Sequence, residues 1–298
     1  MSCICLIGCK NGTVGKHINT VLRKADGGER DVRYLSRSSS NEWKGDASSP
    51  LPPGFLDGCT RACVILPQSF TSEEMEVHGK RIGEELVSAG VTEVVRLSSY
   101  NIGAEPSQGP LGMAHERIEA YYVQKGLLVV SVRPTSFFSN FQFSVESIVK
   151  DGVMRSPLGT APHSRVNWVS PEDIGGVLAK LLLEPDLRGK TRQGGPLLIV
   201  NVEGGVENTF SAQEQAAAIS GLGLEYLPNG GEVRYEEATP PMSSDYSELW
   251  GFLQKGGFSA EGGGETVREF LGRQPKLFVD YARDTLMAYI QNETKRNT

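Results

Sequence analysis

The chain has 298 residues, of which 39% are hydrophobic and 22% charged, and its formal net charge is -6. This is the composition of an ordinary globular protein, which excludes disordered, collagenous and coiled-coil classes. The length allows one large domain or two smaller ones. The acidic balance argues against a surface built to neutralise a phosphodiester backbone, so we expect no nucleic-acid partner.

The N-terminal segment Met1–Ile7 lacks the basic region of a signal peptide, and no later stretch approaches the roughly 20 apolar residues of a membrane helix. We therefore expect no membrane partner and a cytoplasmic location. The five cysteines all lie in the first 63 residues, a distribution that does not resemble a disulfide framework. Because several lie in apolar strand patterns, we expect buried reduced thiols and no metal site at Cys3, Cys5, Cys9, Cys59 and Cys63.

Along the first two thirds of the chain, apolar runs alternate with helical patterns, which is typical of a parallel sheet with helices on both faces. We predict strands at 3–7, 31–36, 62–66, 93–98, 127–132 and 197–201, and helices at 14–25, 71–89, 111–125 and 171–183. The Ser-, Pro- and Gly-rich segment 38–57 predicts a loop with at most a short strand near Glu42–Lys44. One crossover helix is thus expected to be shortened or lost.

After residue 201 the pattern is mainly helical, with helices expected at 211–220, around Tyr246–Lys255, at 264–271 and at 275–292. We expect the polar tail Glu293–Thr298 to be frayed. The predicted fold class is α/β, a Rossmann-type doubly wound parallel sheet with a smaller, mostly helical C-terminal lobe. Residues 1–135 and 166–203 are assigned to the Rossmann core, and 136–165 and 204–298 to the substrate-binding lobe.

A glycine turn lies directly between the first predicted strand and the first helix. Here backbone N–H groups can approach a pyrophosphate, and the helix N-terminus adds partial positive charge. The spacing Gly8-x-x-x-Gly12-x-x-Gly15 departs from Gly-x-Gly-x-x-Gly, and a tight turn without a ligand is the alternative. Its place in the βα pattern favours a dinucleotide site that uses Gly8, Cys9, Lys10, Asn11, Gly12, Thr13, Val14 and Gly15.

The tip of the second strand indicates which dinucleotide binds. An NAD site would present an acidic residue there to the ribose 2′-hydroxyl. The sequence has Arg37 and Ser38 instead, and an arginine can meet a 2′-phosphate through charge-assisted hydrogen bonds. An exposed loop arginine is also commonly just solvated. The predicted cofactor is NADP(H).

Several ordered motifs resemble the NmrA-like branch of the atypical short-chain dehydrogenases/reductases, and within it ergot-alkaloid reductases of the festuclavine dehydrogenase type. In chain order they are Val64-Ile65-Leu66-Pro67, Leu97-Ser98-Ser99, His115-x-x-x-Glu119, Arg133-Pro134-Thr135-Ser136-Phe137-Phe138-Ser139-Asn140, Ser170-Pro171-Glu172-Asp173-Ile174 and Pro275-Lys276-Leu277-Phe278. The resemblance implies further cofactor contacts from Pro67, Ser98, Ser99, His115, Pro134 and Thr135. Cys9 stands where that family has its first glycine, so the phosphate turn departs from the family pattern.

Short-chain dehydrogenases generally use a Tyr-x-x-x-Lys pair, in which lysine lowers the tyrosine pKa for proton transfer. Tyr121 and Lys125 have this spacing, but they come too close to the strand at 127–132. Alignment with the family places Leu111 and His115 at the two positions, so the standard pair is expected to be missing. The candidate catalytic substitutes are Tyr100 and His115, the latter alternatively a ribose- or backbone-bonding residue.

An aromatic cluster follows the Arg133-Pro134 motif. Together with Tyr100 it predicts a substrate pocket formed by Phe137, Phe138 and Phe141, although such clusters are more often core. The leading functional hypothesis is an NADPH-dependent oxidoreductase that reduces a small, apolar molecule by hydride transfer. The alternatives are a catalytically inactive NADP(H)-binding redox sensor that acts through a protein partner, and a cofactor-free structural relative.

Overall fold

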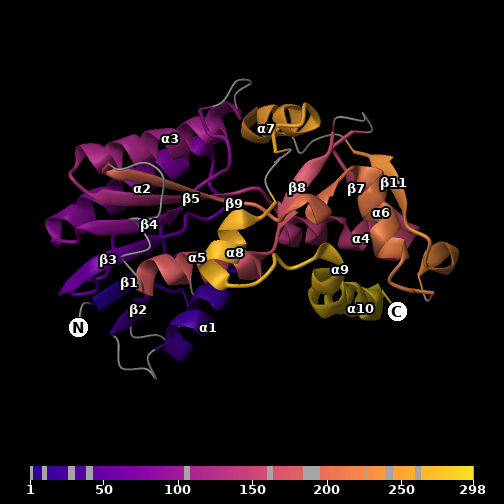
Figure 1. The fold of residues 1–298 in the computed structure, drawn as a ribbon, viewed down its shortest axis with the longest axis horizontal. Helices are drawn as coiled ribbons and strands as arrows, with labels where there is room; N and C mark the ends of the chain where they lie inside the picture. Colours follow the sequence, from indigo (N-terminus) through magenta and orange to yellow (C-terminus); the bar gives the residue numbers. More distant parts are fainter. Residues whose placement is uncertain are drawn as a thin grey trace.

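The computed structural model describes residues 3–8, 12–25, 31–37, 43–103, 108–159, 164–183, 195–225, 227–238, 244–258 and 263–297. A parallel sheet of six strands forms the centre of the N-terminal part, in the order β2-β1-β3-β4-β5-β9 (Figure 1). Its strands are β1 (Cys3–Ile7), β2 (Val32–Tyr34), β3 (Cys59–Val64), β4 (Glu93–Leu97), β5 (Leu128–Pro134) and β9 (Leu197–Val202). Each neighbouring pair is parallel. The predicted Rossmann-type fold class is confirmed.

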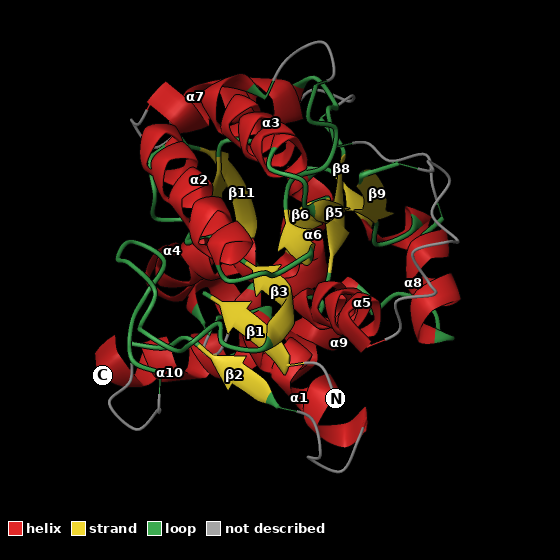
Figure 2. Cartoon of the chain, turned by 90° about the vertical axis from the view of Figure 1, so that its left-hand side faces the viewer, coloured by secondary structure: helices red, strands yellow, loops and turns green. Residues whose placement is uncertain are grey.

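Helices cover both faces of this sheet (Figure 2). α2 (Ser72–Ser88) packs against α3 (Gly109–Gln124) on one face, and α1 (Gly15–Ala25) against α5 (Pro171–Leu183) on the other. Glycines allow the close approach of α2 to α3: a Cβ at Gly79 would stand 2.7 Å from Ile118 Cδ1, and one at Gly83 would stand 2.6 Å from Tyr122 Cε1. These two glycines therefore set the close packing of α2 on α3.

The segment between β2 and β3 contains turns but no helix over residues 43–58, as expected for a lost crossover helix. A single bridge joins Ser36 to Lys44, at the place of the short strand predicted there. Glu42 lies outside the described residues.

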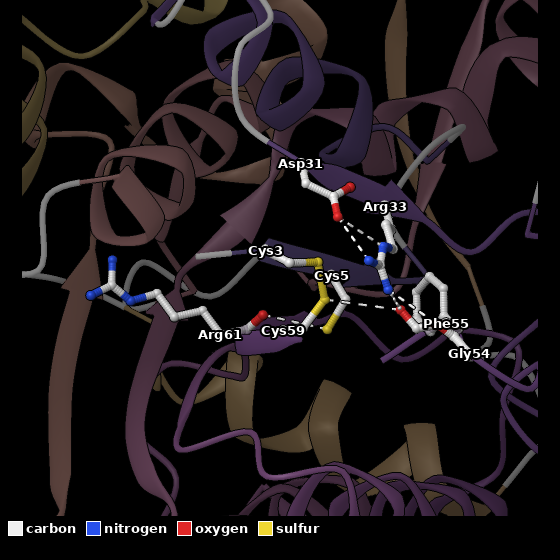
Figure 3. Close-up of a disulfide and its surroundings, with 8 residues drawn as sticks. All are labelled: Cys3, Cys5, Asp31, Arg33, Gly54, Phe55, Cys59 and Arg61. Carbon is white, nitrogen blue, oxygen red and sulfur yellow. Dashed lines mark hydrogen bonds and ion pairs between the residues drawn. A yellow bond between two sulfur atoms is a disulfide. The ribbon is translucent and has the colours of Figure 1, made fainter. Parts of the chain in front are cut away.

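The prediction of reduced cysteines is wrong for one pair. Cys3 and Cys59 form a disulfide, because the parallel register of β1 and β3 sets them opposite each other (Figure 3). Cys5 and Cys63 are free and buried. Burial, reinforced by the neighbouring Cys63, raises the pKa of the Cys5 thiol to about 12, which keeps it an unreactive thiol. Among the described residues no group of three or more metal-ligating side chains is brought together.

The C-terminal half forms a second core built from short strands and helices (Figure 1). The strands are β6 (Ser136–Phe137), β8 (Val166–Val169) and β10 (Thr209–Phe210) in one sheet, and β7 (Val153–Ser156) and β11 (Arg234–Glu237) in another. The helical segments are η1 (Phe138–Ser144), α4 (Val145–Asp151), η3 (Val206–Asn208), α6 (Ala212–Ser220), η4 (Pro228–Gly231), α9 (Phe278–Tyr281), η5 (Ala282–Leu286) and α10 (Met287–Asn297). The tail predicted to fray continues α10 to Asn297 instead.

Two helices of the C-terminal segment return to the Rossmann part. α8 (Glu265–Leu271) buries Val267 and Phe270 in the core shared with α5 and β9. α7 (Ser244–Gln254) lies against α3, and its Asp245 carboxylate accepts a 2.7 Å hydrogen bond from the backbone N–H of Ser72 at the start of α2. The domain boundary at residue 204 stays a prediction. α7 and α8 follow that boundary in the sequence but pack against elements of the Rossmann core. None of the described helices has the length and apolar character needed to cross a membrane.

Candidate functional site

A cleft of about 530 Å³ runs along the carboxyl edge of the sheet, where a doubly wound fold binds its ligands. Its walls come from the segments that follow β1, β2 and β3, from the last residue of β4, and from the end of β6 and the start of η1. The lining residues are Gly8, Gly12, Thr13, Val14, Gly15, Leu35, Ser36, Arg37, Gly45, Asp46, Ala47, Ser48, Ile65, Leu66, Pro67, Gln68, Ser69, Phe70, Leu97, Phe137 and Ser139.

The glycine turn forms the floor of this cleft. Gly8 has φ +77°, and a Cβ there would stand 2.0 Å from the carbonyl oxygen of Ile65, so only glycine fits between β1 and β3. Gly12 lines the cleft, and a Cβ there would meet no atom within 4 Å. α1 begins at Gly15 and has no acidic residue in its first turn. The partial positive charge of its N-terminus is therefore free to attract an anion.

The end of the cleft beside β2 holds the predicted phosphate-binding arginine. Arg37 is exposed and lines the cleft together with Asp46 and Ser48. The Ser48 hydroxyl donates a 2.5 Å hydrogen bond to Asp46, and this bond, with help from Arg37, lowers the pKa of the Asp46 carboxyl. Asp46 has no signal in the sequence, because the Ser- and Gly-rich loop around it could not be placed against the cleft.

Four predicted cofactor contacts, Cys9, Lys10, Asn11 and Ser38, lie outside the described residues. At the other end of the cleft, Pro67 and Phe137 are among the lining residues. The polar side chains among the remaining candidates form hydrogen bonds within the chain instead. Ser98 donates a 2.6 Å hydrogen bond to Glu119, Ser99 donates one of 2.9 Å to Gln108, and Thr135 donates one of 2.9 Å to Asn167, while Pro134 is buried at the end of β5.

His115 on α3 is held by the fully buried Arg96 of β4. The Arg96 guanidinium donates to the His115 carbonyl oxygen at 2.9 Å and lies 3.0 Å from its ring Nδ1. Because a guanidinium can only donate, Nδ1 must accept, and the ring proton is assigned to Nε2. Burial, with the charges of Arg96 and Arg133, lowers the pKa of His115 well below its usual range. His115 is thus a neutral hydrogen-bond donor and not an imidazolium acid, and it is not among the residues that line the cleft.

This arrangement predicts a pH dependence of stability. Because the His115 pKa is lower in the folded state, its contribution is fully present above about pH 6.5 and is lost as the pH falls toward the folded pKa. Between about pH 7.5 and about pH 5.5 we expect the free energy of unfolding to fall roughly 1.4 kcal/mol more in the wild type than in His115→Gln. Urea unfolding at both pH values measures this difference, and equal losses in the two proteins would contradict it.

Tyr100 lies beyond β4, next to an acidic partner that the sequence did not indicate. Its hydroxyl donates a hydrogen bond to Glu203, which directly follows β9. Its ring packs edge-on against Phe258, with the centroids 5.9 Å apart. Burial and the neighbouring carboxylate raise the pKa of Tyr100, so the phenol stays protonated at neutral pH.

Asn167 is a third residue without a sequence signal, after Asp46 and Glu203. It is fully buried in β8, accepts hydrogen bonds from Thr135 and from the Gly204 N–H, and donates to Gly205 and Thr209. It ties the segment after β9 to the segment after β5. Only the folded chain brings these partners together, so the sequence could not have revealed its role.

Two other features lie away from the cleft. Tyr121 donates a 2.5 Å hydrogen bond to Glu84 of α2, and Lys125 also approaches this glutamate, at 3.9 Å. The predicted substrate residues Phe138 and Phe141 are buried in the core of the second lobe, against Phe278. Their packing gives no support to a direct substrate contact.

No protein-family model matches the chain, and no curated protein matches its sequence. Solved structures do match it. The NADPH-dependent quinone oxidoreductase QOR2 from Escherichia coli, in complex with NADPH, has a TM-score of 0.72 at 14% identity, over 95% of this chain and 99% of that one. The triphenylmethane reductase of Citrobacter sp., in complex with NADP(H), has a TM-score of 0.70 at 14% identity, with the same coverage. NmrA, a negative transcriptional regulator in complex with NAD, has a TM-score of 0.69 at 16% identity, over 99% of this chain and 97% of that one. The chain therefore shares the Rossmann fold of these proteins over nearly its whole length.

Proposed function

We propose that the protein is an NADPH-dependent oxidoreductase that reduces a small, largely apolar molecule. The observation that carries this proposal is the cleft, in which the glycine turn, the N-terminus of α1 and Arg37 line one continuous surface. The residues present fit a dinucleotide, because Gly12 leaves open space for a diphosphate beside the helix N-terminus. A bound dihydronicotinamide supplies a hydride.

The protein's own part would be to bind and orient the two reactants. The turn at Gly12 and Gly15 would hold the diphosphate, Arg37 the 2′-phosphate, and Pro67 and Phe137 the opposite end of the dinucleotide. Both reductases named above were solved with NADPH or NADP(H). The resemblance to ergot-alkaloid reductases extends the proposal to cyclic iminium substrates. A cytoplasmic location stays a prediction from the sequence.

The Arg37 assignment has a direct test. Removing one charge-assisted phosphate contact costs roughly 1.5–3 kcal/mol, so we expect Arg37→Ala to weaken NADPH binding by about ten- to a hundredfold and to leave NADH binding unchanged. Titration of both cofactors, followed by fluorescence, measures this. Arg23→Ala is the matched control, because it removes the same charge from the exposed far end of α1. Equal affinity of the wild type for NADPH and NADH would contradict the assignment.

A catalytically inactive redox sensor that acts through a protein partner is the second candidate. It is favoured by the position of Tyr121 and Lys125 against α2, and by the neutral state of His115. One structural neighbour, NmrA, is described as a negative transcriptional regulator.

Anaerobic oxidation of NADPH against a panel of quinones, enals and cyclic iminium ions separates the two candidates. Turnover with any of these acceptors supports the reductase. Tight NADPH binding without turnover of any acceptor would favour the sensor.

A further inference from the structure

Tyr100 and Glu203 meet at the carboxyl edge of the sheet, outside the set of residues that line the cleft. The sheet order places β5 between β4 and β9, so a hydrogen bond from Tyr100 to Glu203 spans the end of β5. The backbone confirms this position: the Tyr100 N–H donates to the Pro134 carbonyl oxygen, and the Thr135 N–H donates to that of Val202, both at 3.1 Å. Leu97 and Phe137, which line the cleft, belong to the same edge. The pair therefore lies on the carboxyl edge of the sheet, next to the elements that carry these two lining residues.

The backbone beside Glu203 is held firmly. The next residue, Gly204, donates a 2.9 Å hydrogen bond to the buried Asn167. A Cβ at Gly204 would stand 1.7 Å from the carbonyl oxygen of Trp168, so the segment is pressed against β8. The Glu203 carboxylate is thus presented from a rigid element, which is the arrangement that a selective binding group needs.

The charge of Glu203 is not balanced by a cationic side chain among the described residues. Glu203 is half-buried, and no cationic side chain in the described part of the chain forms an ion pair with it. The nearby Glu265 has the same sign and is itself paired with Arg268 at 3.0 Å. Burial raises the pKa of Glu203, the hydrogen bond from Tyr100 opposes this in part, and the repulsion from Glu265 adds to the rise. A partly desolvated carboxylate without a counter-ion is relieved when a cation binds beside it.

The surroundings suit a flat cation. The Tyr100 phenol lies next to the carboxylate, the Phe258 ring packs against the Tyr100 ring, and aromatic rings attract positive charge. We propose that Glu203 makes the substrate site selective for positive charge, so that the site favours conjugated hydride acceptors that are cations. This proposal rests on the reductase function proposed above.

The chemistry balances without a proton donor. The hydride brings both electrons of the new C–H bond to the electron-poor carbon of the acceptor, which becomes neutral as the dinucleotide becomes oxidised. No proton moves in this step. The absence of Tyr121 and Lys125 from the cleft lining is therefore compatible with turnover of such an acceptor.

The test compares two aromatic probes of nearly the same shape, the N-methylacridinium cation and neutral acridine at about pH 8. Their binding is followed by fluorescence quenching, with and without NADP⁺, so that no turnover is needed. We expect Glu203→Gln to weaken N-methylacridinium binding by about tenfold and to leave acridine binding unchanged. Glu203→Asp should keep the preference for the cation. Glu207→Gln is the matched control, because it makes the same change at an exposed glutamate on the same segment.

Equal N-methylacridinium affinity in Glu203→Gln and wild type would overturn the proposal, and so would equal losses for both probes. Circular dichroism and urea unfolding establish that each variant is folded. The cofactor titration is read separately: a protein that fails to bind NADPH but selects the cation through Glu203 contradicts the reductase function alone. A protein that binds and oxidises NADPH without this selection contradicts the role of Glu203 alone.

Discussion

Gly12→Asp is expected to weaken NADPH binding by about a hundredfold or more, with little change in stability. The substituted side chain would project into the cleft, because no atom lies within 4 Å of the Cβ position. There it would fill the space for the diphosphate and set a negative charge against it at the N-terminus of α1. Loss of one hydrogen bond to a charged group already costs roughly 1.5–3 kcal/mol, and like-charge repulsion adds to this.

The effect of Gly12→Asp on NADPH binding is separated from its effect on folding by two measurements, made on this variant and on Gly8→Ala. NADPH titration gives the affinity, and urea unfolding gives the free energy of unfolding. Gly8→Ala is the contrasting variant, because its φ of +77° and its contact with Ile65 should destabilise the fold by about 2 kcal/mol or more. If Gly12→Asp binds NADPH as the wild type does, the dinucleotide does not lie on this turn.

The sheet could be predicted from the sequence because its strands are continuous apolar runs between helical patterns. β1 and α5 have the predicted bounds, whereas β3 begins three residues before the predicted start at Ala62. Its first residues, Cys59–Arg61, are partly polar and join the sheet through pairing with β1. The strands of the second lobe were missed, since β6 and β10 have two residues each and exist only through partners distant in the sequence. Local periodicity cannot indicate such pairs.

The proposed phosphate-binding turn could be identified from the sequence because its residues directly follow a strand. The proposed substrate end could not. Glu203 is a single acid after a strand, and only the position of β9 beside β5 brings it to Tyr100. The aromatic run after Pro134 was ambiguous for a physical reason: it forms a short 3-10 helix, and rings three residues apart on it, Phe138 and Phe141, face the core of the second lobe. The pairing of Cys3 with Cys59 likewise depends on the register of β1 and β3.

The second large effect is expected at the buried charge network beneath the carboxyl edge of the sheet. Glu119 of α3 accepts hydrogen bonds from Ser98 at 2.6 Å, from Arg133 at 2.5 Å and from Ser131, and lies 3.5 Å from the fully buried Arg96. Glu119→Ala would leave the two arginines without their carboxylate. Removing one partner of a buried ion pair costs about 3–5 kcal/mol, and we expect the free energy of unfolding to fall by this amount.

The matched control is Glu116→Ala, which removes the same side chain from an exposed position of the same helix and should change stability by no more than about 0.5 kcal/mol. Urea unfolding of both variants gives the comparison. Because Arg96 also contacts the ring of His115, the loss of Glu119 would leave the positive charges of Arg96 and Arg133 uncompensated beside that ring, and these charges should keep the histidine neutral. A loss below about 1 kcal/mol in Glu119→Ala would mean that water reaches the arginines and that the network does not organise this edge of the sheet.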